Sequence, residues 1–176
     1  MRGYIACMSE CPEVCGQEAA GLENYPSELV ADNEWVCRTV RPAEYKTKNS
    51  LKAAFIQTSK LRAGELSAWR LHDPAQLPEL EAKLVAGGNP PDNIIAAQAR
   101  DLRRIAIQDR LRSVSVINDT RIDDAGNHDP QHVTIAPCAQ LMAAADPDEI
   151  TSEIKAQLLL VFRSQRAQAL KQVPEK

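Results

Sequence analysis

Short apolar runs in the first half of the chain predict β-strands. Residues 35–40 alternate between two sets of side chains and are rich in β-branched types, so they predict a strand. Residues 51–58 and 65–71 form two further apolar runs. Gly64 lies between these runs and provides a turn residue. The two runs therefore predict a β-hairpin.

Helical spacing of apolar residues predicts three helices. The first, over residues 74–86, begins after Asp73 and ends at Gly87. Residues 93–113 repeat apolar side chains every three or four positions and predict an amphipathic helix. Residues 147–162 begin with a proline and two acidic residues, which favour the start of a helix, and they predict the third.

The remaining apolar runs complete the predicted fold. Residues 114–118 and 132–136 predict two strands that are joined by a polar loop containing glycine. The strands are grouped along the chain rather than alternating strictly with helices. The pattern therefore predicts an α+β fold, with a small, mostly antiparallel sheet and about three helices packed against it. The sequence also lacks the glycine-rich phosphate loops of the two common nucleotide-binding folds.

The distribution of charge divides the chain near residue 34. Residues 1–34 contain seven acidic residues and one basic residue, whereas the rest contains 17 acidic and 20 basic residues. Few bulky apolar residues precede Trp35, so residues 1–34 are predicted to be an acidic, flexible extension that adds little stability. As an alternative, this acidic segment covers a basic face of the domain. Residues 35–176 are predicted to be a single α+β domain with a helical insertion at 73–112.

Composition excludes a membrane-spanning protein. The mean hydropathy is −0.36, and no apolar run approaches the roughly 18 residues that a membrane span needs. The first residues include one basic side chain and only a brief apolar stretch, which does not resemble a secretory signal. We therefore expect a cytoplasmic protein whose five cysteines are reduced.

Two groups of residues are candidate metal ligands. Cys7, Cys11 and Cys15 are spaced by four, and with Cys37 they offer four sulfur ligands for zinc, but Pro12 interrupts any helix that would align them. His128 and His132 are also four apart, in a loop that enters a strand rather than on a helix. Neither spacing is typical of a metal site, so the sequence predicts no metal and no cofactor. The role of the three N-terminal cysteines is left open.

His132 and Thr134 are the candidate catalytic residues. In a strand, alternate side chains point to the same side, so this imidazole and this hydroxyl project together. The pair resembles one half of the H-x-T signature of the two-histidine phosphoesterases, which implies a phosphodiesterase-like activity. Those enzymes need a second copy of the signature, and this sequence has none.

Five arginines are candidate anion-binding residues. Arg38 and Arg70 lie in predicted strands, where they either converge with His132 or form the exposed side of a half-buried sheet. The other three lie with Arg110 on one arc of the predicted helix 93–113, where they would face nucleic-acid phosphates or solvent: Arg100, Arg103 and Arg104. A net charge of −3, a pI near 5.7 and 4% aromatic residues disfavour nucleic acid.

The order of four motifs resembles a class of small bacterial proteins of unassigned activity. The motifs are a strand with Arg38, the pair Ala54-Phe55, a Leu66-Ser67 element followed by Arg70, and the late His132 before a strand. The resemblance covers about 100 residues and implies a bacterial origin but no activity.

These observations favour a non-enzymatic, cytoplasmic bacterial accessory protein that acts by binding another protein. The first alternative is a phosphate-handling enzyme in which His132 and Thr134 act together with Arg38 and Arg70. The second alternative is nucleic-acid binding through the arginine arc. A single pocket lined by Arg38, Arg70 and His132 would favour the enzyme, whereas scattered positions would favour the binding protein. The oligomeric state is left open.

Overall fold

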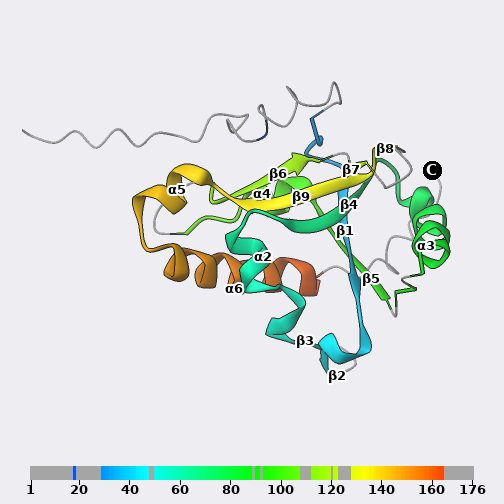
Figure 1. Ribbon diagram of the computed structural model, residues 1–176, viewed down its shortest axis with the longest axis horizontal. Coiled ribbons are helices and arrows are strands. Elements are labelled where there is room, and N and C mark those ends of the chain that lie inside the picture. Colours follow the sequence, from blue (N-terminus) through cyan, green and yellow to red (C-terminus); the bar gives the residue numbers. More distant parts are fainter. Residues whose placement is uncertain are drawn as a thin grey trace, which may run out of the picture.

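The architecture is built on one five-stranded antiparallel sheet (Figure 1). The structure, a computed structural model, describes residues 18, 29–47, 50–88, 90–91, 93–107, 112–119, 121–122 and 128–164. The sheet has the order β5-β1-β4-β9-β6, so β4 is central and β5 and β6 are the edges. Its strands are β1 (Trp35–Val40), β4 (Leu66–Leu71), β5 (Asn93–Gln98), β6 (Val114–Asn118) and β9 (His132–Pro137).

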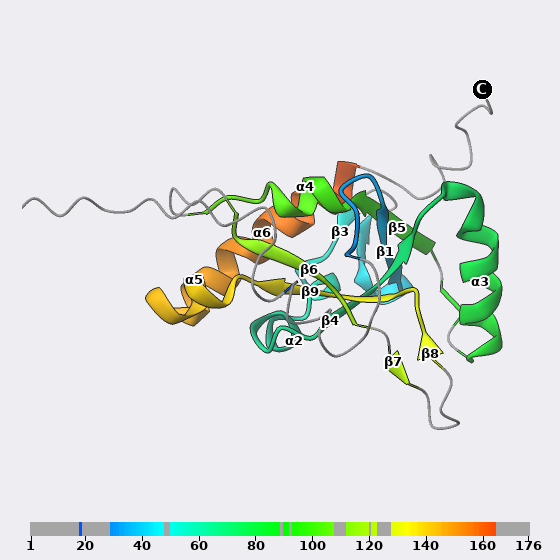
Figure 2. The same cartoon turned by 90° about the horizontal axis from the view of Figure 1, so that it is seen from above.

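Helices cover both faces of this sheet (Figures 1 and 2). The described α-helices are α2 (Thr58–Arg62), α3 (Leu77–Ala86), α4 (Ala99–Arg103), α5 (Ala139–Ala144) and α6 (Pro147–Ser164). Single-turn 3-10 helices are formed by Pro42–Glu44, Ala53–Phe55 and Pro74–Gln76. Two small two-stranded sheets pair β2 (Tyr45–Thr47) with β3 (Ser50–Leu51) and β7 (Arg121–Ile122) with β8 (His128–Asp129). The predicted α+β class is confirmed, although the described helices outnumber the three expected.

Strand alternation produces two hydrophobic clusters, one on each face of the sheet. The larger cluster packs one face against α6, whose buried residues Ile150, Ile154, Leu158 and Phe162 recur at helical spacing. The smaller cluster packs the other face against α3 and contains Cys37, Leu71, Ile94, Ala96, Leu77, Leu80 and Leu84. Because β5 is covered on both faces, its residues 94–97 are all apolar and buried.

The prediction of a helix over residues 93–113 is wrong except at residues 99–103, because the other described residues of this range are not helical. Residues 93–98 form β5, which pairs antiparallel with β1 along its whole length, from Trp35 opposite Gln98 to Val40 opposite Asn93. Ile94 and Ile95 point to opposite faces of the sheet and are both buried, so the run has no polar side. A short apolar run of this kind cannot be assigned to strand or helix by periodicity alone. The helix that follows, α4, has only five residues.

The predicted hairpin before β4 is also wrong, because residues 58–62 form α2. Phe55, Ile56 and Leu61 are fully buried, whereas the four residues from Gln57 to Lys60 are exposed in succession. Four consecutive exposed residues break the alternation of a half-buried strand. The turn role of Gly64 is confirmed. Its φ is +68°, and the Gly64 and Glu65 amides donate to Leu61 and Lys60 carbonyls, as in a Schellman cap.

Three residues of the predicted N-terminal extension are buried in the structure: Glu18, Val30 and Glu34. Val30 belongs to the larger hydrophobic cluster, and Glu34 lies directly before β1. Residues 1–17 and 19–28 lie outside the described residues, so the predicted flexibility of this segment stays a prediction. Among the described residues, no helix is long and apolar enough to cross a membrane.

Candidate functional site

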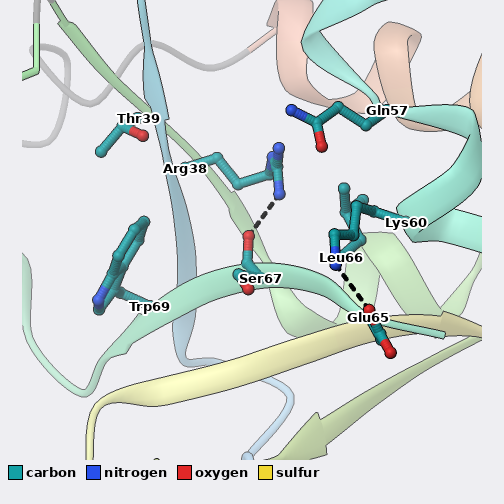
Figure 3. A pocket seen from close by; sticks show the side chains of 8 residues that line it. All are labelled: Arg38, Thr39, Gln57, Lys60, Glu65, Leu66, Ser67 and Trp69. Carbon is teal, nitrogen blue, oxygen red and sulfur yellow. Dashed lines mark hydrogen bonds and ion pairs between the residues drawn. The ribbon is translucent and has the colours of Figure 1, made fainter. Parts of the chain in front are cut away.

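The candidate site begins where two neighbouring strands of the sheet stop pairing. β1 and β4 pair from Trp35 opposite Leu71 to Cys37 opposite Trp69, and their register ends there. Beyond this point β1 stays paired with β5, and β4 stays paired with β9, so each strand follows its other neighbour. The side chain of Arg38 lies in the gap that results (Figure 3).

Backbone carbonyls hold the Arg38 guanidinium in this gap. Its Nη1 donates to the carbonyl of Ser67, and its Nη2 donates to the carbonyl of Phe55 at 3.1 Å. The guanidinium also lies 5.0 Å from the centre of the Phe55 ring, within the range of a cation–π contact. These contacts join β1, β4 and the 3-10 helix Ala53–Phe55, so Arg38 replaces strand pairing with side-chain hydrogen bonds.

The positive charge of Arg38 has no ion-pair partner among the described residues. Burial lowers its pKa to about 10, and the charge of the Glu44 carboxylate opposes that shift. An arginine with this pKa is still charged at neutral pH. A largely buried cation held only by neutral carbonyls is costly, and an anion brought close to it would offset that cost.

A cleft with a volume of about 230 Å³ opens beside Arg38 (Figure 3). It is lined by Arg38, Thr39, Gln57, Lys60, Glu65, Leu66, Ser67 and Trp69. Polar side chains from β1, β4 and α2 therefore face one space, and Trp69 provides an apolar wall. Lys60 forms an ion pair with Glu65 at 2.7 Å, and both side chains are more than half exposed. This surface pair is weak enough to open when a ligand approaches.

The second predicted anion-binding residue of the sheet, Arg70, does not line this cleft. Its Nε donates to Glu34 Oε2 at 2.7 Å, and its Nη2 donates to Glu34 Oε1 at 3.1 Å. Both side chains are buried, and the Glu34 carboxylate also accepts the backbone N–H of Ala31. Arg70 is therefore neutralised inside the protein.

The predicted catalytic pair His132 and Thr134 shares one side of β9, as expected, but lies outside the cleft. The Thr134 hydroxyl donates to Asp119 Oδ2 at 2.8 Å, and His132 Nδ1 lies 2.7 Å from the Asp119 carbonyl oxygen. Both side chains are buried. The Trp69 ring, which lines the cleft, meets the His132 ring edge to face at 6.4 Å between centroids. Arg38, Arg70 and His132 thus occupy three separate surroundings.

Arg100, Arg103 and Arg104 lie in α4 or directly at its end, but they do not form one exposed cationic face. Arg100 is half exposed and lies 4.0 Å from Asp101, and Arg104 is exposed at the end of α4. Arg103 is mostly buried and pairs with Glu18 and Asp32. Arg110 lies outside the described residues. Of the three described arginines, Arg103 is therefore neutralised within the chain.

The metal candidates gain no ligand cluster in the part of the chain that the structure describes. Cys7, Cys11 and Cys15 lie outside it, and Cys37 is a free, buried thiol between the sheet and α3. Burial raises the pKa of Cys37 to about 12, so this sulfur is a protonated thiol at neutral pH.

Sequence reasoning missed three residues that matter to these surroundings. Lys60 and Gln57 reach the cleft from α2 and the residue before it, in a stretch whose pattern predicted a hairpin. Asp119 holds both His132 and Thr134, and its position directly after a predicted strand was the available signal.

In comparisons with known proteins, no family model, curated protein or solved structure matches this chain.

Proposed function

We propose that this chain is a binding protein without catalytic activity, and that its Arg38 cleft receives an acidic group of a protein partner. The observation that carries this proposal is the charge of Arg38, which faces the cleft without a carboxylate partner among the described residues. Arg70 and Arg103, by contrast, are already neutralised. Arginine suits this role because its guanidinium binds carboxylates with directed hydrogen bonds.

The separation of the candidate catalytic residues favours binding over phosphate chemistry. A phosphate-handling enzyme would need His132 and Thr134 to act on the same group that Arg38 and Arg70 clamp. His132 and Thr134 are buried against Asp119, and Arg70 is buried against Glu34. The pairing of Arg103 within the chain likewise reduces the support for nucleic-acid binding.

The bacterial and cytoplasmic setting is part of the same proposal. It is supported by the resemblance of the Arg38, Ala54-Phe55 and His132 motifs to small bacterial proteins. The free thiol of Cys37 fits a reducing compartment.

The proposal is tested with a glutamate-rich peptide as the probe and the two tryptophans as reporters. Both tryptophans pack against the smaller cluster, but Trp69 also lines the cleft and Trp35 does not, so Trp35 serves as an internal control. In NMR titrations of the full chain we expect the peptide to shift the Trp69 indole N–H and to leave that of Trp35 unchanged. A matched glutamine peptide should shift neither signal.

Arg38→Gln removes the charge inside the cleft, and Arg41→Gln removes the same charge from an exposed position just after β1. We expect Arg38→Gln to weaken peptide binding by about tenfold or more, the usual effect of losing a hydrogen bond to a charged group. Equal weakening by both variants would mean that only net charge matters and would overturn the site. Hydrolysis of cyclic nucleotides or RNA ends that is lost in folded His132→Ala and Thr134→Ala variants would instead establish the enzyme.

A further inference from the structure

Glu18 makes a set of contacts that connects the N-terminal segment to the far edge of the sheet. Its side chain is almost fully buried. Oε1 accepts the backbone N–H of Val116 at 2.8 Å, the Nη2 of Arg112, and the Nε of Arg103 at 3.3 Å. Oε2 accepts Arg103 Nη2, also at 3.3 Å. One carboxylate therefore collects four donors from residues at least 85 positions away.

The two arginines that surround Glu18 are also held by other groups. Arg103 donates from Nη2 to the Val30 carbonyl at 2.7 Å and from Nη1 to Asp32 at 2.6 Å. Arg112 donates from Nε to the Val114 carbonyl at 3.3 Å. None of these bonds involves Glu18, so each guanidinium group has contacts that do not depend on Glu18. A pair of cations fixed in this way is prepared for a carboxylate.

The third donor comes from the edge of the sheet. Val116 lies in β6, whose one strand partner in the described chain is β9. The Val116 N–H that reaches Glu18 is therefore a backbone donor on an edge strand, where such groups otherwise bind water or another chain. Two guanidinium groups and one amide N–H provide the convergent donors that a carboxylate needs.

The burial of the arginines makes the charge balance at this site important. Their side chains are 12% exposed for Arg103 and 10% for Arg112, and Asp32 is a second carboxylate that pairs with Arg103. Asp32 is 70% exposed, so Glu18 is the buried carboxylate that lies against both guanidinium groups. A buried carboxylate at this position therefore offsets part of the cost of burying the two positive charges.

We propose that Arg103, Arg112 and the Val116 N–H form a carboxylate-binding site, that Glu18 is its occupant within this chain, and that the occupant is exchangeable. The ligand class is a carboxylate on a short, flexible group. Two sources offer this chemistry, a glutamate on an acidic peptide segment and a small free carboxylate such as acetate. The site is separate from the Arg38 cleft and does not depend on the function proposed for that cleft.

The test is chemical rescue in the full-length chain. Glu18→Ala removes the occupant, and we expect its melting midpoint to fall by about 5 °C or more. Sodium acetate at equal ionic strength should then restore at least half of that loss relative to sodium chloride and should shift the Val116 amide signal. A pentapeptide with the sequence of residues 16–20, which contains the glutamate, forms the second arm. A stronger rescue by this peptide would identify a peptide segment as the better occupant.

Two variants serve as controls. Glu79→Ala removes the same charge from an exposed position in α3 and should gain nothing from acetate. Glu18→Gln keeps the side-chain volume but brings an amide NH₂ toward two cations, so its midpoint should fall and acetate should not restore it. The proposal is overturned if Glu18→Gln keeps the wild-type melting midpoint and the wild-type position of the Val116 amide signal. This outcome can be measured even if the alanine variant fails to fold. It is equally overturned if folded Glu18→Ala gains no more from acetate than from chloride.

Discussion

Arg70 and Glu34 form an ion pair inside the protein, with 2.7 Å between Nε and Oε2 and side-chain exposures of only 4% and 6%. Glu34 precedes the first strand of the sheet, and Arg70 lies near the end of the central strand. The pair therefore ties the entry of the chain into the sheet to the middle of the sheet. Its burial also explains why an arginine that looked like an anion-binding residue is structural.

Breaking this pair from one side is expected to destabilise the protein strongly. Arg70→Met leaves the Glu34 carboxylate buried without its cation and should lower the free energy of unfolding by about 3–5 kcal/mol. The double variant Arg70→Met with Glu34→Leu should recover most of that loss, because it removes both charges. Urea unfolding measures these changes. Arg62→Met breaks an exposed pair with Asp148 and should cost less than about 1 kcal/mol; an equal loss in both single variants would contradict the buried role.

The buried thiol of Cys37 predicts a loss of stability at alkaline pH. In the unfolded chain the thiol ionises near its ordinary pKa of 9.0, whereas burial holds the proton in the folded chain until a pH of about 12. Above the lower value the unfolded state binds fewer protons, so the free energy of unfolding falls with pH, by up to about 1.4 kcal/mol per pH unit. This contribution is absent below the lower value.

Comparison with Cys37→Ala isolates this effect from other groups that titrate at high pH. The difference in unfolding free energy between wild type and variant should shrink by about 2 kcal/mol between about pH 8 and about pH 10.5. Denaturant unfolding at the two pH values measures it. A difference that stays constant would mean that the thiol is accessible to water in the folded state.

Gly64 and Gly87 form a matched pair for testing backbone strain. Gly64 has a φ of +68°, where an alanine is strained, although a new Cβ would meet only Ala136 at 3.5 Å. Gly87 ends α3 with a φ of −76°, which any residue adopts. We expect Gly64→Ala to lower stability by about 1 kcal/mol and Gly87→Ala to be neutral or slightly stabilising. Thermal melting tests both, and equal effects would contradict the assignment of Gly64 as the cap of α2.

Helix α6 offers a similar contrast between buried and exposed side chains. Phe162 is fully buried and meets Phe55 edge to face at 5.8 Å, whereas Leu160, on the same helix, is 55% exposed. Phe162→Ala should cost about 3–5 kcal/mol because it leaves a cavity in the larger cluster. Leu160→Ala should change stability by no more than about 0.5 kcal/mol. Equilibrium unfolding of both variants decides whether α6 packs as described.

Local sequence signals were sufficient for α6 and insufficient for β5. Pro147 and the acidic residues after it mark the start of α6, and its buried residues recur with a period that only a helix explains. The run Ile94 to Ala97 is apolar at every position because two helical layers cover β5, and that burial depends on partners distant in sequence. Tertiary packing therefore decided the conformation of β5.

The candidate site was predictable only in part for the same reason. Arg38 was identified as an anion-binding candidate, and it does line the cleft. The neutralisation of Arg70 by Glu34, and of Arg103 by Glu18, joins residues 36 and 85 positions apart. No spacing rule connects such pairs, because the fold alone brings them together.

The position of β4 at the centre of the sheet has a consequence for the newly made chain. One neighbour, β1, is synthesised before β4, whereas the other, β9, is separated from it by α3, β5, α4 and β6. Until His132–Pro137 has left the ribosome, one edge of β4 therefore lacks its partner, and unpaired edges are where nascent chains adhere to each other. We therefore expect β4 to be open to wrong pairing in that interval of translation, before α5 and α6 are complete.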